Sequence, residues 1–174
     1  LGKFAAAVKS ALKQGDVAKA EQLCNQQQGS VANVVLAALT EYKKQQGTDL
    51  ETEKKVLAIQ KTIEEATALE MPMMQENLPI IGTIVTLGTL MGLLGTVMGM
   101  IKSFSAMGSG EGGADSSALS VGISEALVNT ASGIATGAAA VIAYNYYTNK
   151  IDRLTFAIDE LGFTIVETFK TTQK

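Results

Sequence analysis

Two long stretches with almost no charged side chains constrain the fold of this chain more than any other feature. The first, 78–101, is 24 residues long and has no ionisable side chain, while the second, 118–148, contains a single carboxylate, Glu125. A helix rises about 1.5 Å per residue, so 24 residues extend ~36 Å, enough to cross a hydrocarbon layer of ~30 Å. We therefore expect an all-α integral membrane protein with two transmembrane helices, over 78–104 and 118–148.

Small residues form one face of each expected span. On a helical wheel at ~100° per residue, Gly88, Gly92, Gly95 and Gly99 of the first span fall within ~60° of one another, and glycine and alanine line one side of the second. Small residues allow membrane helices to approach closely. The positions that we expect to serve helix packing are Gly88, Gly92, Gly95, Gly99, Gly133 and Gly137.

A polar stripe lies next to the small face of the second span. Glu125, Asn129, Ser132 and Thr136 fall within a ~60° arc of the helical wheel. A carboxylate inside a membrane helix costs about 2.5–3.5 kcal/mol, so such a group usually faces a bundle interior or a wet cavity and marks an ion or proton path. The alternative is that Glu125 lies near the membrane surface, hydrated and inert.

The residue pattern leaves two alternatives for each of three threonines. Thr89 and Thr96 lie beside the glycine face of the first span, and each hydroxyl either bonds back to its own helix or lines a pore. Thr130 falls well off the polar stripe and could face a neighbouring helix.

The segments on either side of the spans are charged. Residues 1–77 contain nine lysines and ten acidic residues, which predicts a water-exposed helical region. Glycines and good N-cap residues divide this region into four helices, with Asp16, Ser30 and Asp49 as the expected caps. Apolar residues at helical spacing continue through 149–174, which predicts an amphipathic C-terminal helix that leaves the bilayer.

The distribution of positive residues predicts the topology. Lysine and arginine flank the spans on their outer sides, whereas the connecting segment has none beyond Lys102. Positive residues mark the cytoplasmic side of a membrane. We therefore expect 1–77 and 149–174 to be cytoplasmic and 105–117 to be a loop in the periplasm.

Composition excludes several classes of function. A net charge of −3 and a pI near 5.0 argue against nucleic-acid binding. The chain has no histidine, and no nucleophile with a base, metal-ligand cluster or phosphate loop is recognisable, so we expect neither an enzyme nor a bound cofactor or metal. The single cysteine, Cys24, excludes an internal disulfide and is expected to be a small buried apolar side chain.

Two sequence blocks resemble the ExbB/TolQ/MotA proton-channel family. These blocks are GTLMGLLGTVMGMIKSF (88–104) and GISEALVNTASGIATGAAAVIAYNYY (122–147), and GDVAKAEQLC (15–24) is similar to the cytoplasmic region of the family. The chain looks most like the ExbB branch, with TolQ next. The flagellar branch, with its larger cytoplasmic domain and extra span, fits less well.

The resemblance implies an assembly that the residues alone do not show. It implies three spans, the first of them before Leu1, and a homo-oligomer, a pentamer, around a dimer of single-span ExbD-like or TolR-like partners in the inner membrane of bacteria. It also implies that proton flow turns the complex and that the partner transmits force to a client such as a TonB-like protein.

The resemblance also assigns roles to particular residues. By motif, Thr96, Glu125 and Thr130 match the polar pore residues of the family, with helix tilt or a fivefold arrangement turning Thr130 toward the lumen. Asn129 stands where alanine is more usual in the family. The partner helix carries the aspartate usually taken as the proton carrier.

These observations leave a leading hypothesis and two alternatives. The leading hypothesis is a proton-driven motor subunit that energises an outer-membrane or envelope process such as TonB-dependent transport. One alternative is a TolQ-like or gliding-type motor subunit. The other is a non-conducting membrane scaffold, in which Glu125 only serves packing and leucine would be tolerated at Ser132 and Thr136.

Overall fold

The computed structural model describes residues 1–108 and 116–173, and every regular element among them is an α-helix. The chain divides into two compact units. One combines Leu1–Glu76 with Asn149–Lys174, and we call it the charged unit; the other, Asn77–Thr148, we call the apolar unit. The prediction of an all-α chain with two long apolar helices is confirmed.

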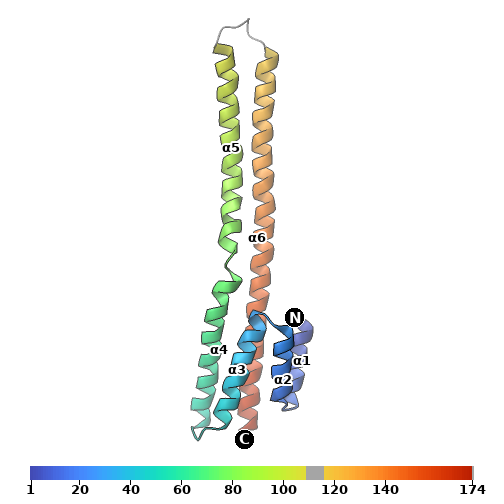
Figure 1. Ribbon diagram of the computed structural model, residues 1–174, viewed down its shortest axis with the longest axis vertical. Helices are drawn as coiled ribbons and strands as arrows, with labels where there is room; N and C mark the ends of the chain where they lie inside the picture. The colour runs from blue at the N-terminus through green and yellow to red at the C-terminus, as the bar shows by residue number, and fades with distance from the viewer. Residues whose placement is uncertain (109–115, 174) are drawn as a thin grey trace. The chain divides into compact units, whose positions relative to one another are not determined.

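The charged unit is a helical bundle built from both ends of the chain. Helices α1 to α4 lie beside the last part of α6 (Figure 1), and α1 packs on α2, α2 on α3 and α3 on α4. The helices are α1 (Gly2–Lys13), α2 (Val17–Gln27), α3 (Ser30–Gln46), α4 (Thr52–Met74) and α6 (Ser116–Thr172).

One of the three predicted helix caps is confirmed and two are wrong. The Asp16 side chain accepts a hydrogen bond from the Lys19 backbone N–H at 3.0 Å, as an N-cap should. Gly29 occupies the N-cap position of α3 instead of Ser30, because its φ of +101° turns the chain directly into the helix. Asp49 also does not cap a helix, because α4 begins only at Thr52, after an extended residue.

The core of the charged unit depends on the C-terminal part of α6. Tyr42 and Phe169 are both buried, and their rings make an edge-to-face contact with centroids 5.2 Å apart. The Tyr42 hydroxyl lies 3.2 Å from that of Thr172, and an ion pair between Lys9 and Glu160 joins α1 to α6. The buried α6 residues of this core are Ile158, Leu161, Ile165, Val166 and Phe169.

Cys24 belongs to the same core. Its side chain is buried, and burial together with the charge of Glu21 raises the pKa of the Cys24 thiol to about 11. The thiol therefore stays protonated near neutral pH and packs as a small apolar group.

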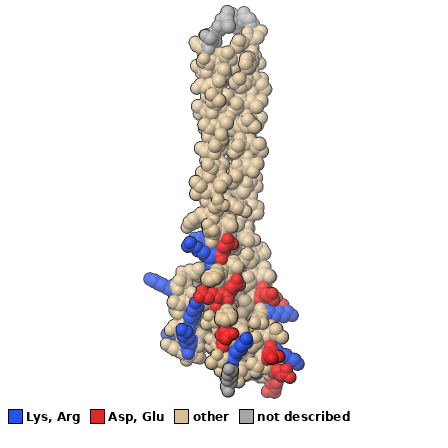
Figure 2. Space-filling view, turned by 180° about the vertical axis from the view of Figure 1, so that it is seen from behind, with Lys and Arg blue, Asp and Glu red and all other residues tan. Residues whose placement is uncertain are grey.

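The apolar unit consists of α5 (Leu78–Gly108) and the first part of α6, joined by the segment that contains residues 109–115. Apolar windows in Thr52–Gly108 and Ser117–Thr172 have mean hydropathies of 1.9 and 1.5, so both stretches are long and apolar enough to cross a membrane. Charged side chains gather over the charged unit, while the apolar unit is uncharged over nearly its whole length on the face that Figure 2 shows.

The two helices extend further than the sequence predicts. Helix α5 continues through Gly108, and α6 already begins at Ser116, so both enter the segment expected to be a loop over 105–117. Serine, alanine and methionine in 105–107 do not end a helix, so the polar composition of the whole segment is a poor guide to where α5 ends. Residues 109–115 of the expected loop lie outside the described residues.

Candidate functional site

Helices α5 and α6 meet most closely at a pair of glycines. A Cβ atom added at Gly92 would lie 2.8 Å from both the Gly133 Cα and the Asn129 carbonyl oxygen, and one added at Gly133 would lie 2.7 Å from the Gly92 Cα. Real Cβ contacts are not this short, so at this point the two backbones touch with no room for any side chain.

The contact continues along both helices in a fixed antiparallel register. A Cβ at Gly99 would meet the Ala126 methyl at 3.1 Å, and one at Gly88 would meet the Thr136 methyl at 3.1 Å. All the glycines expected to serve helix packing lie at this contact: Gly88, Gly92, Gly95, Gly99, Gly133 and Gly137.

Two further residues at the contact were missed by the sequence analysis. Ser103 is buried, its hydroxyl donates to the Gly99 carbonyl at 2.9 Å, and its side chain fills the space that a side chain at Gly122 would need. Ser103 comes one turn after Gly99, so extending the glycine face by one small residue would have found it. At the other end of the pair, Gly82 packs against the ring of Tyr144.

A pair of threonine hydroxyls links the helices beside the glycine contact. The hydroxyl of Thr96 lies 2.9 Å from the Ala126 carbonyl oxygen on α6 and 3.3 Å from the Gly92 carbonyl oxygen on its own helix. It also forms a hydrogen bond with the Thr130 hydroxyl. Because Thr96 has one hydroxyl proton, donation to Ala126 leaves Thr130 to donate to Thr96.

The polar stripe of α6 is exposed in the single chain. Glu125, Asn129, Ser132 and Thr136 all have exposed side chains, whereas Gly133, Gly137 and the neighbouring alanines that face α5 are buried. The Asn129 side chain rests against Gly95, and the Thr136 hydroxyl donates to the Ser132 carbonyl at 2.9 Å. No described residue forms a hydrogen bond or ion pair with Glu125.

The expected site residues therefore form two groups. Consecutive residues of α5 flank the contact line, with Gly95 touching Asn129 on one edge and Thr96 touching Thr130 on the other. Glu125 lies one turn from Asn129 and shares its edge. The structure thus brings Thr96 and Thr130 together and places Glu125 on the opposite edge of the helix pair.

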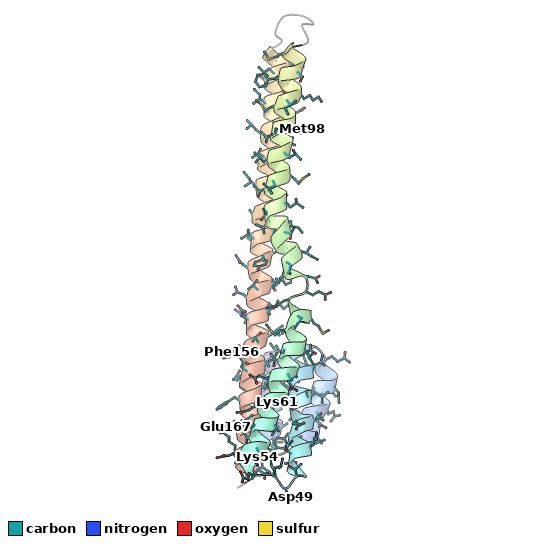
Figure 3. The ribbon with its side chains drawn as sticks, turned by 90° about the vertical axis from the view of Figure 1, so that its left-hand side faces the viewer. Asp49, Lys54, Lys61, Met98, Phe156 and Glu167 are labelled. Carbon is teal, nitrogen blue, oxygen red and sulfur yellow. The ribbon has the colours of Figure 1, made fainter. Side chains whose placement is uncertain are left out.

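The outward surface of α5 differs in character from the stripe on α6. Large apolar side chains project from it along its length, and Met98, which is 59% exposed, illustrates this in Figure 3. Such a surface suits contact with lipid, while a stripe headed by a carboxylate does not. Among residues 1–108 and 116–173, no group of three or more histidine, cysteine, aspartate or glutamate side chains could hold a metal ion.

Two long apolar helices in close contact, with a polar stripe on one of them, are the architecture of an integral membrane protein. The model of the MotA/TolQ/ExbB proton channel family matches residues 26–160. The chain therefore belongs to this family, and the resemblance seen in its sequence motifs is confirmed.

Similar proteins named ExbB or ExbB-like support the same family. A "Putative biopolymer transport protein ExbB-like 3" from Synechocystis is 38% identical over 86 residues, 49% of this chain and 41% of that protein. The "Biopolymer transport protein ExbB" of Helicobacter pylori is 42% identical over 79 residues, 45% of this chain and 54% of that protein. A "Putative biopolymer transport protein ExbB homolog" from Methanothermobacter thermautotrophicus is 33% identical over 94 residues. The matched regions cover between 33% and 54% of these relatives' own length.

Proposed function

We propose that this chain is a proton-channel subunit of an ExbB–ExbD-type motor. It uses the proton motive force across the inner membrane of bacteria to energise an envelope process such as TonB-dependent transport. The observation that carries the proposal is the exposed stripe of Glu125, Asn129, Ser132 and Thr136 on an apolar helix. Its role is that of a channel subunit and not of an enzyme.

The exposure of the stripe is an argument for an assembly. Leaving an ionised Glu125 in lipid would cost about 2.5–3.5 kcal/mol, and this cost disappears if the stripe faces polar groups or water. A ring of copies, a pentamer, whose α6 helices face a central ExbD-like or TolR-like partner dimer would cover the stripe, while the outer surface of α5 contacts the bilayer.

The stripe is long enough to line about half of a proton path. Glu125 and Thr136 are 11 residues apart, about 16 Å along the helix axis, or half of a ~30 Å hydrocarbon layer. In this mechanism the partner's carboxyl group, taken to be an aspartate, exchanges its proton beside Glu125, and Ser132 and Thr136 offer hydrogen bonds further along the lumen. Thr96 and Thr130 hold together the helix pair that carries the stripe, and helix tilt or the fivefold arrangement turns them toward the same lumen.

The charge pattern supports an orientation for the chain. The lysines and arginine of the charged unit favour the cytoplasmic side, so residues 1–77 and 149–174 are proposed to be cytoplasmic and the 105–117 connection periplasmic. The charged bundle is then exposed to water in the cytoplasm.

Replacement of Glu125 tests the proposal directly. In cells that carry the full-length protein and its partner, we expect Glu125→Ala to lower proton-dependent client transport by about a hundredfold, because the partner's carboxyl group loses the carboxylate beside which it exchanges its proton. Co-purification of the partner should be unchanged. Leu127→Ala is the matched control, since Leu127 is 62% exposed and lies off the stripe. Normal client transport by the Glu125→Ala complex would remove Glu125 from the mechanism.

The scaffold alternative predicts a different pattern. A scaffold has no need for aligned polar groups, so Ser132→Leu and Thr136→Leu would be neutral, whereas a proton path would lose transport in both. An uncoupler that collapses the proton gradient should abolish transport by the channel and leave a scaffold's function intact. A TolQ-like or gliding-type motor would share the proton dependence, and mass spectrometry of the co-purified single-span partner distinguishes these branches.

A further inference from the structure

Lys102 and Glu125 are the one base and the one carboxylate among residues 77–108 and 116–148. Helix α5 extends six residues beyond Lys102, to Gly108, and Glu125 lies nine residues inside the start of α6 at Ser116. Both side chains are exposed. Lys102 is therefore well within the helix pair, about 9 Å from its loop-side end, and not at the end of the span.

The register of the two helices places Lys102 and Glu125 at nearly the same depth. The contacts of Gly99 with Ala126 and of Ser103 with Gly122 show that each step toward the loop on α5 matches one step toward the loop on α6. Lys102 lies three steps beyond Gly99, and Glu125 lies one step beyond Ala126. Their Cα atoms thus differ in depth by about 3 Å.

The two residues also share one edge of the helix pair. Lys102 lies two turns beyond Gly95, and Glu125 lies one turn from Asn129, so each shares the helix face of that residue. A Cβ at Gly95 would lie 3.0 Å from the Asn129 Cβ, which shows that these two faces meet. Side chains tilt toward the N-terminus of their own helix, so in this antiparallel pair Lys102 and Glu125 tilt toward each other.

We propose that Lys102 is the charge partner of Glu125, and this inference rests on the proposed function. No ion pair within 4.0 Å joins the two side chains here, and rotation of the flexible lysine side chain closes the pair. Charged groups in membrane helices pair with one another because an unpaired charge there is costly. Lys102 thereby neutralises the carboxylate and positions it at the loop-side end of the polar stripe.

Cross-linking tests the proximity independently of proton transport. In the full-length protein with its partner, in membranes and with all native cysteines replaced, we introduce Lys102→Cys with Glu125→Cys. The control pair is Met100→Cys with Glu125→Cys, because Met100 is level with Glu125 but lies one turn beyond Thr96, on the opposite edge. A short bifunctional thiol reagent that fluoresces only when both ends react should label the first pair within a single chain far more than the control. Equal labelling, or more labelling of the control pair, would contradict the placement of Lys102 and Glu125 on the same edge of the helix pair.

A double-mutant cycle tests the charge pairing. We expect Lys102→Gln to lower the thermal midpoint of the detergent-solubilised complex by about 2–4 °C and Lys102→Arg to leave it unchanged, because arginine keeps the charge. In a Glu125→Gln background, Lys102→Gln should no longer lower the midpoint. Lys102→Arg should also retain client transport, while Lys102→Gln should lower it about fivefold to tenfold.

The outcomes separate this inference from the proposed function. Additive effects of Lys102→Gln and Glu125→Gln on the midpoint would overturn the pairing, whatever the transport result. If the midpoints couple but Glu125→Ala retains transport, the pair exists and the proton-path proposal fails instead.

Discussion

At the scale of single residues, the Thr96 side chain links α5 to α6. Its hydroxyl donates to the Ala126 carbonyl of α6, accepts from the hydroxyl of Thr130 and lies 3.3 Å from the Gly92 carbonyl oxygen of its own helix, so it contacts both backbones and a second side chain. Hydrogen bonds between membrane helices contribute about 0.6 kcal/mol on average and reach about 1–2 kcal/mol in model peptides. Thr96 is therefore expected to stabilise the helix pair measurably.

Removing this hydroxyl gives a residue-scale prediction. Thr96→Val keeps the shape of the side chain but loses its contacts with Ala126 and Thr130, and we expect it to lower the free energy of unfolding by roughly 0.5–2 kcal/mol. Thr96→Ser should retain most of the stability because it keeps the hydroxyl. Thermal unfolding of the purified complex in detergent measures both.

Thr89 provides the matched control for Thr96. It lies on the same helix, and among the described residues its hydroxyl bonds to the Val85 carbonyl of that helix, at 3.3 Å, and to no group on α6. Thr89→Val should therefore cost less than Thr96→Val. Equal losses in the two valine variants would mean that the bonds across the helix pair add nothing.

Single residues also show what a sequence can and cannot reveal. The polar stripe was predictable because Glu125 and its neighbours share one face of one helix. The pairing of Thr96 with Thr130 was not, because it depends on the register between two antiparallel helices, which a helical wheel of either helix does not contain. The motif placed both threonines in the pore, and the structure shows them bonded to each other.

At the scale of elements, the closeness of α5 and α6 depends on glycine at the crossing point. We expect Gly92→Ala to force the helices apart and to cost about 1–3 kcal/mol, because its Cβ would overlap backbone atoms of Asn129 and Gly133, which cannot move aside easily. The same substitution should lower assembly of the complex, measured by gel filtration, and its thermal midpoint.

Gly82→Ala is the control for this element. It lies on the same helix, and its Cβ would lie 3.6 Å from the Tyr144 ring, an ordinary van der Waals distance. We expect its stability to match that of the unaltered protein or to exceed it slightly, since alanine favours helix formation over glycine. An equal loss of stability in Gly92→Ala and Gly82→Ala would show that the helix contact at Gly92 is not tight.

The helix elements were largely predictable, and their ends were not. Apolar runs and glycine faces fixed the existence of α5 and α6 and the side on which each helix packs. Helix ends depend on weaker local effects, so Ser30 and Asp49 were wrongly expected to cap helices and the segment 105–117 to be a loop throughout.

At the scale of the whole molecule, the core of the charged unit is completed by the end of the chain. Phe169 is fully buried against Tyr42, and we expect Phe169→Ala to destabilise this unit by about 3–5 kcal/mol. Phe163→Ala, on the same helix but 68% exposed, should change stability by no more than about 0.5 kcal/mol. Limited proteolysis of the charged unit measures the difference, and equal protease resistance of the two variants would contradict this core.

The sequence indicated an amphipathic helix over 149–174 but not which surface it covers. Its apolar positions were visible from their spacing, but their partners on α1 to α4 lie far earlier in the chain. Contacts over such distances leave no local pattern, so the assembly of one unit from both ends of the chain emerged only from the structure.

The position of Phe169 and its neighbours has a consequence for biosynthesis. When the ribosome has made α1 to α4, the buried α6 side chains that complete their core do not yet exist, and both apolar helices must be translated before they do. Insertion into the bilayer therefore precedes completion of the water-exposed bundle. Nascent chains stalled before residue 158 should carry an incomplete bundle that chaperones and proteases can recognise.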